Sequence, residues 1–471
     1  MWNPSRSVRA GLIFFLACCS QLASGQEPES ADIQSSDAEV EPAEEPRRER
    51  GSIQFLEEPV YLGIGEDLLI PERGQVPPRP SSIASDGFQQ ERAQAALQSE
   101  IIRIETDEGV WSRQLVEQLG GLGRSYQLQG NHAEAIEAYD RAIHINRVNS
   151  GLDTIEQIPF VEARIRSHLT LGQWAEADLY TNYLYYLQRK AYGGNDPRLI
   201  PVLERLGNWN LQAFHIGFGE SLAMRLSSAF AFFSAASERI ARHYGKTDGR
   251  FARSQHSVAA SAYLIARNPD VLREMYSGMT KLRYDELVDS LEVEDMNDVT
   301  RTYRAGFLAL QEVAASLDGN PAKILEYAQA NVDIGDWNLL YNRTQSAEQV
   351  YELVWEFLLE QENGEQVLQE LFGRVVKLPS FGGTRHPYVE DEIRNGQEQA
   401  TLQFQDVDIM FDVTPNGETR NLRLVSEEFD ETNRDVLRLY SIIRRTKFRP
   451  RVEEGEAVLS RDNVFRYRYW Y

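Results

Sequence analysis

The chain has 471 residues, enough for two or three domains that each bury a hydrophobic core. Its 72 acidic and 49 basic residues give a net charge of −23, which excludes nucleic-acid binding by the chain as a whole, because phosphate contacts need clustered cations. The hydrophobic share of 42% predicts that most of the chain is folded.

Residues 1–25 have the pattern of a secretory signal peptide. Arg6 and Arg9 precede an apolar run, Gly11–Ala17, and Ala23-Ser24-Gly25 supplies the small residues of a cleavage site. The apolar run is too short to cross a bilayer as a stable helix, and no later run is long enough. We therefore expect an exported mature protein without a transmembrane helix.

The two cysteines, Cys18 and Cys19, lie within this predicted targeting segment. Cleavage after residue 25 would leave a mature protein without cysteine, which excludes disulfides, thiol catalysis and cysteine-bound metals. A second interpretation stays open, in which lipid attached at Cys18 anchors the protein to a membrane.

Residues 26–90 form an acidic segment that contains prolines. Between Gln26 and Val60 there are eleven acidic and three basic residues with few apolar ones, which predicts disorder after cleavage. Four prolines between Pro71 and Pro80 predict an extended linker. We expect a solvated tether ahead of the folded part of the chain.

The stretch 91–375 is predicted to be helical, because it has long apolar-periodic runs and few prolines. Small residues let two antiparallel helices approach, tyrosines fill the space between them, and a glycine ends the first helix. The residues that fit these roles at fixed intervals are Gly123, Tyr126, Gly130, Ala135, Tyr139 and Ala142. This pattern resembles the tetratricopeptide repeat, which implies a helix–turn–helix unit.

Weaker copies of the unit follow. Gly172 and Ala177 repeat the turn and the small contact, although Thr181 replaces the second aromatic residue. Gly172 lies forty-two residues after Gly130, more than the ~34 of a regular repeat. The residues of a third match are Gly335, Ala347 and Tyr351. The sequence predicts an irregular tetratricopeptide-like α-solenoid with a concave, partner-binding face.

Polar residues on the first helices are candidates for that concave face, and solvated surface positions are the alternative interpretation. The candidates are Arg124, Gln127, Arg164 and His168.

Motifs of catalysis and metal binding are missing from the sequence. The seven histidines form no pair that would place two imidazoles on one helical face for zinc. The acidic run 292–298 lacks the alternating ligands and the glycine of a calcium loop, and there is no Gly-x-Ser-x-Gly nucleophile motif. We predict that the protein is not an enzyme and holds no metal or cofactor.

The stretch 401–471 follows a predicted linker at 376–400 and has the pattern of a small β–β–α–β module. Polar and apolar residues alternate from Val407 to Val413, and Asn416-Gly417 favours a tight hairpin turn. Helical spacing follows between Val436 and Ile443, and the run from Val458 to Tyr471 predicts a long final strand. This order resembles the TonB C-terminal domain, which implies a small α+β domain that docks onto other proteins.

Arginines and tyrosines gather in the second half of this module. They are candidates for a docking edge, where a partner segment adds as an extra strand and its acidic side chains face the arginines. In the alternative interpretation, two arginines protect an exposed strand edge while the tyrosines cover the core. The candidates are Arg444, Arg445, Arg449, Arg466, Tyr467, Arg468 and Tyr469.

These patterns predict a non-catalytic periplasmic adaptor of the Gram-negative envelope that binds other envelope proteins. The alternative is an accessory or energy-transducing component of TonB-dependent outer-membrane transport, with receptors or TonB-system components as partners. TonB proteins couple through an N-terminal membrane helix and a long Pro-rich spacer, and neither pattern is present here. A cell-envelope enzyme is a third hypothesis, with no support beyond the abundance of carboxylates.

Overall fold

The computed structural model describes residues 55–56, 58–64, 83–219, 221–276, 298–381, 404–426, 429–430 and 432–470. The predicted signal peptide, both cysteines and most of the two predicted linkers lie outside these residues.

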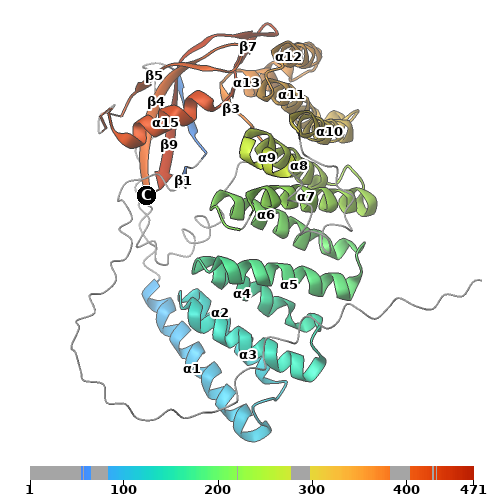
Figure 1. The fold of residues 1–471 in the computed structure, drawn as a ribbon, viewed down its shortest axis with the longest axis vertical. Helices are drawn as coiled ribbons and strands as arrows, with labels where there is room; N and C mark the ends of the chain where they lie inside the picture. The colour runs from blue at the N-terminus through green and yellow to red at the C-terminus, as the bar shows by residue number, and fades with distance from the viewer. Residues whose placement is uncertain are drawn as a thin grey trace, which may run out of the picture. The chain divides into compact units, whose positions relative to one another are not determined.

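Helices make up the first and larger part of the described chain (Figure 1). The earlier ones are α1 (Ile83–Glu108), α2 (Leu115–Leu128), α3 (His132–Ser150), α4 (Ile158–Thr170), α5 (Trp174–Tyr192), α6 (Ile200–His215) and α7 (Leu222–Tyr244). They are followed by α8 (Gly249–Arg267), α9 (Pro269–Tyr276), α10 (Val299–Leu317), α11 (Ile324–Leu340), α12 (Thr344–Leu359) and α13 (Gly364–Phe372).

Helices close in the sequence pack as pairs, and each pair packs on the next. The pairs are α2 with α3, α4 with α5, α6 with α7, α8 with α10, and α11 with α12. Contacts of α3 with α4, α7 with α8 and α10 with α11 join neighbouring pairs. The predicted helical-repeat arrangement is therefore confirmed for this part of the chain.

The turn inside a pair recurs four times with the same backbone geometry. It contains a residue with positive φ: Gly130 (80°), Gly172 (68°), Gly217 (71°) or Asn342 (59°). In each turn the next residue donates its N–H to a carbonyl five residues earlier, for example Asn131 to Tyr126 at 2.9 Å. Glycine and asparagine tolerate this backbone region, which explains why these residue types end the first helices.

The connection between pairs also recurs. A side-chain oxygen accepts the N–H of the residue two positions later and so caps the following helical segment. The accepting residues are Thr154, Asp196, Asp248 and Asn320. Short 3-10 helices follow three of them: η1 (Ile155–Gln157), η2 (Pro197–Leu199) and η4 (Pro321–Lys323).

Glycines of first helices face aromatic rings of second helices. A Cβ at Gly123 would lie 2.5 Å from Cε1 of Tyr139, and one at Gly335 would meet the ring of Tyr351 in the same way. In α4 and α5 the positions with the same spacing hold Ile165 and Thr181, which are both buried. The bulky side chain there comes from the first helix, so the pair packs without an aromatic residue at this position.

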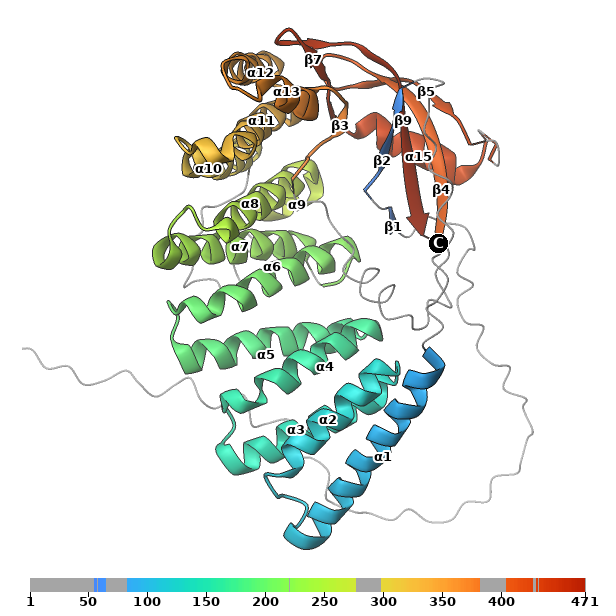
Figure 2. The same ribbon diagram turned by 180° about the vertical axis from the view of Figure 1, so that it is seen from behind.

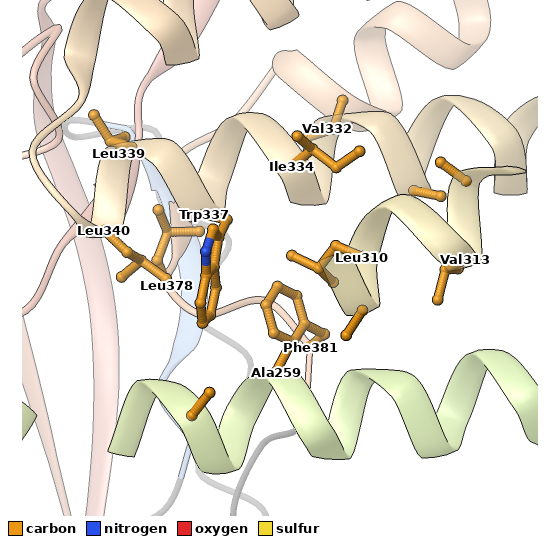
Figure 3. Packing of buried hydrophobic residues seen from close by; sticks show 14 of the residues in the cluster. Ala259, Leu310, Val313, Val332, Ile334, Trp337, Leu339, Leu340, Leu378 and Phe381 are labelled. Atoms are coloured by element: carbon orange, nitrogen blue, oxygen red, sulfur yellow. The ribbon is translucent and has the colours of Figure 1, made fainter. Parts of the chain in front are cut away.

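The largest hydrophobic cluster lies in the later pairs, from α7 to α13. At its centre, the fully buried Trp337 donates its indole N–H to the carbonyl of Tyr303 at 3.0 Å. Figure 3 shows Trp337 beside Phe381, above Ala259 of α8. Phe381 follows α13, so the chain leaving the helices packs back onto this cluster.

The C-terminal part is an antiparallel sheet with one long helix on its core face. The elements after α13 are β3 (Val376–Lys377), β4 (Phe404–Val413), β5 (Thr419–Leu424), α15 (Arg434–Arg445), β6 (Phe448–Arg449), β7 (Arg451–Glu453), β8 (Glu456–Val458) and β9 (Ser460–Trp470). Alternate residues of β4 from Val407 to Val413 are buried with α15, as the sequence pattern predicts.

Two strands from the predicted disordered segment belong to this sheet. β1 (Phe55–Leu56) and β2 (Val60–Ile64) pair antiparallel with β9, which places β9 between them and β4 (Figure 2). The prediction of an unstructured tether does not hold for these residues. The strand β2 could have been predicted from its short apolar run, but the charged residues around that run favoured a prediction of disorder.

Candidate docking site on the C-terminal sheet

The long strand β9 carries different partners on its two edges. β4 pairs with it from Phe404↔Trp470 to Val413↔Ser460, with a single register shift near its end. The other edge holds β1 opposite Trp470 and Tyr469, and β2 opposite residues 463–466. An extended segment thus already occupies the edge on which a partner strand was expected to add.

This added segment is held less completely than β4. β1 and β2 are separated by residues 57–59, and Pro59 has no N–H to donate. The register shifts between Tyr61 and Gly63, where Gly63 has a φ of 130°. Tyr61 packs on Phe465, with ring centroids 5.1 Å apart, whereas Val60 and Ile64 are 58% and 40% exposed.

Arg466 and Arg468 do not face a partner strand. Each guanidinium pairs with an aspartate directly opposite on β4: Arg466 with Asp408 through two bonds of 2.8 Å, and Arg468 with Asp406 at 2.8 and 3.0 Å. The hydrogen bonds to Asp408 raise the pKa of Arg466. These arginines lie on an interior strand, so they do not protect an exposed strand edge either.

Tyr467 and Tyr469 cover the core, as the alternative interpretation expected. Both are buried on the face that α15 covers, and the Tyr469 hydroxyl donates to Oε1 of Gln405 at 2.9 Å. Burial raises the pKa of Tyr467 far above its usual value. Neither phenol is accessible to a docking protein.

Arg449 is buried where the C-terminal part meets the helices, so it is not on a docking edge. Its Nε and Nη2 donate to the carboxylate of Asp336 in α11, and its Nη1 donates to the carbonyl of Leu371 at 2.9 Å. Tyr351, whose ring packs on Gly335, donates its hydroxyl to the same carboxylate at 2.8 Å. Burial raises the pKa of Asp336, and Arg449 opposes that rise.

Arg444 and Arg445 remain exposed at the last turn of α15. Arg445, but not Arg444, lines a pocket of about 340 Å³ that also has walls from α8 and β3. Its other charged lining residues are Glu58, Arg267 and Lys377. The structure therefore places four of the seven predicted docking residues on an interior strand, Arg449 at a buried junction, Arg445 in this pocket and Arg444 on the exposed surface beside it.

The polar residues proposed for a concave face are mostly engaged within the helices. Gln127 donates to Ala163 O and Ser167 Oγ, and Arg164 donates to the Tyr180 hydroxyl at 2.6 Å. His168 is 4% exposed and bonded to Gln173, whereas Arg124 is exposed. The bonds of Gln127 tie α2 to α4 of the next pair, whereas those of Arg164 and His168 lie within the pair of α4 and α5.

Within the described ranges, no three His, Cys, Asp or Glu side chains are placed to hold a metal ion. In the same residues, no helix combines the length and the apolar character needed to cross a membrane.

No protein-family model and no curated protein sequence matches the chain. Among solved structures, it is similar to a putative kinesin light chain from Podosopora anserina with nearly identical TPR-like repeats. That match has a TM-score of 0.35 and 13% identity, and covers 55% of this chain and 97% of the other. BtubC (BKLC) from P. vanneervenii matches with a TM-score of 0.32 and 12% identity, over 60% of this chain and 92% of the other. Both TM-scores are below 0.5, so the helical-repeat arrangement is established by the contacts between its own helices.

Proposed function

We propose that this protein is a non-catalytic adaptor of the periplasm that binds other envelope proteins through its helical array and its TonB-like sheet. The compartment comes from the predicted signal peptide, and the docking role comes from the resemblance of residues 401–471 to the TonB C-terminal domain. One observation carries the proposal: the outer edge of β9 holds an extended segment from a distant part of the sequence.

Strand addition at an edge gives affinity through main-chain hydrogen bonds and specificity through alternate side chains. The segment 55–64 uses both: its backbone pairs with β9, and Tyr61 inserts against Phe465. Its ladder is interrupted between β1 and β2, and Val60 and Ile64 are exposed, so it covers the edge of β9 less completely than β4 covers the other edge. A continuous strand from a partner can therefore replace it.

The helical array supplies a second surface. Apolar side chains are exposed in the α1–α2 connection (Val110, Trp111) and in the α3–α4 connection (Leu152, Ile155), and Tyr186 of α5 is exposed as well. The connections are held together, since Asn149 donates to Trp111 O at 3.0 Å and Tyr183 donates to Leu152 O at 3.3 Å. Exposed apolar groups gathered on a fixed scaffold are typical of protein-binding surfaces.

A disulfide lock tests strand exchange. Val60 and Arg466 are paired across β2 and β9, so V60C/R466C can hold the segment in place when oxidised. We expect the reduced variant to capture envelope proteins in a pull-down and the oxidised variant to lose them. Receptors or motor subunits in the captured set would favour the transport alternative. Equal capture in both redox states would contradict strand exchange.

A further inference from the structure

We infer that the pocket between α8, α15 and β3 is a carboxylate-recognition site, which takes an acidic side chain of the extended peptide that lies on β9. This inference rests on the proposed function, because it names the chemistry of the segment that the sheet accepts.

The pocket has an apolar floor and a cationic rim. Ala260 and Leu264 of α8, Leu378 and Pro379 after β3, and Ile442 of α15 supply apolar groups. Arg267, Lys377 and Arg445 supply positive charges from three different elements. Such a volume and mixture of groups fits a side chain with an apolar body and one charged group.

The cations are positioned by the fold. Arg267 ends α8 and donates from Nη2 to the carbonyl of Arg445 at 2.9 Å, which also caps the last turn of α15. Lys377 lies in β3, which is paired to β6. The Arg445 guanidinium, in contrast, makes no ion pair within the described residues, and it lines the pocket from an exposed position. It is the cation that an incoming carboxylate can use.

The chain itself already presents a carboxylate at this rim. Glu58 lies two residues before β2, and its Oε2 accepts a bond from Nζ of Lys377 at 2.7 Å. An acidic residue just ahead of a strand on β9 therefore reaches the pocket. A net charge of −23 makes a pocket lined by three cations and one carboxylate unusual for this chain. The partner expected from this geometry is a strand-forming segment preceded by acidic residues.

The test uses the full chain with a protease site inserted between residues 71 and 80. Cutting there removes the tether, so a fluorescent peptide copying residues 53–64 can exchange with the chain's own segment. A second peptide carries glutamine in place of Glu57 and Glu58. R445E changes the pocket, and R444E is the matched control, because Arg444 is the adjacent exposed arginine of the same helix and does not line the pocket.

At low salt, we expect the cut protein and its R444E variant to bind the acidic peptide at least about threefold more tightly than the glutamine peptide. In R445E the preference for the acidic peptide should fall, because a carboxylate replaces one of the three cations while Lys377, the partner of Glu58, stays. Raising the salt should narrow the difference in affinity between the two peptides in the other proteins. Equal binding of both peptides to the unsubstituted protein would overturn the pocket while leaving strand capture intact. If neither peptide binds, strand capture itself fails and the pocket falls with it.

Discussion

Arg449 and Asp336 form a fully buried ion pair between the C-terminal sheet and the helical array. Nη2 of Arg449 lies 2.9 Å from Oδ2 of Asp336, and the two side chains are 2% and 0% exposed. Asp336 also accepts hydrogen bonds from Tyr351 and Ser380. The pair thus joins β6, α11, α12 and the chain after α13 in one polar network, which fixes the C-terminal sheet on the last helix pairs.

Removing the arginine should strongly destabilise this junction. We expect R449M to lower the free energy of unfolding by about 3–5 kcal/mol, because it leaves a buried carboxylate without its counter-ion. Urea unfolding followed by tryptophan fluorescence measures this loss, with Trp337 next to Asp336 in the sequence as a reporter. The control R444M removes an exposed arginine and should change stability by about 0.5 kcal/mol or less.

The loss in free energy of unfolding caused by R449M should depend on pH. Burial raises the pKa of Asp336, and R449M removes the positive charge that opposes that rise. A raised folded-state pKa means that stability is retained at low pH and lost as pH rises through that value. The difference between R449M and the unsubstituted protein should therefore shrink as pH falls. A deficit that grows on acidification would contradict this account of the carboxylate.

Two glycines of α2 should respond differently to alanine. At Gly123 a Cβ would lie 2.5 Å from the ring of Tyr139, which is buried and held by its bond to Gln127, so G123A should cost about 1–3 kcal/mol. At Gly121 the nearest atom is a methyl of Leu97 at 3.2 Å, so alanine should be neutral or gain up to about 1 kcal/mol of helix propensity. Thermal or urea unfolding of both variants decides this, and similar losses would count against close packing at Gly123.

The sequence predicted the helical repeats because their signals are local. Glycine at positive φ and small residues against tyrosines are spaced by the geometry of two adjacent helices. Gly217 was missed as a turn because Asn210 and Leu226 stand where the first repeat has glycine and tyrosine, and Asn342 was missed because it replaces the turn glycine itself. The pair of α8 and α10 was also missed, because α9 is inserted between the two helices and the repeat spacing between them is lost.

The site was predicted less well, because it depends on contacts between residues far apart in the sequence. Arg449 and Arg466 both belong to an arginine-rich stretch, yet one pairs with a helix residue and the other with β4. Charge alone does not reveal these partners. The alternation of β4 did contain a hint, since Asp406 and Asp408 lie on the face opposite its core residues, where cross-strand cations pair with them.

The connections between helix pairs should lose stability in acid. Asp196 caps η2 and accepts hydrogen bonds from Arg198. The bonds from the Arg198 guanidinium, and to a smaller extent the bond from the Arg198 backbone N–H, lower the pKa of Asp196 to about 2. A depressed folded-state pKa contributes stability above the unfolded value and loses it as pH falls toward 2. D196N should therefore be less stable than the unsubstituted protein at neutral pH, with a difference that diminishes below about pH 4. Unfolding midpoints measured across this range test it, and a constant difference would show that the charge is irrelevant.

Charge reversal at Arg466 should damage the sheet itself. Arg466 and Asp408 are each 12% exposed and lie directly opposite on β9 and β4, so R466E would place two carboxylates side by side in a partly buried position. We expect a loss of about 1–3 kcal/mol, with much of it recovered by the exchanged pair D408R/R466E. Urea unfolding of the four members of this double-mutant cycle gives the coupling energy. If R466E keeps full stability but loses partner proteins, the arginine faces a partner after all, and the assignment of β9 as an interior strand would have to be given up.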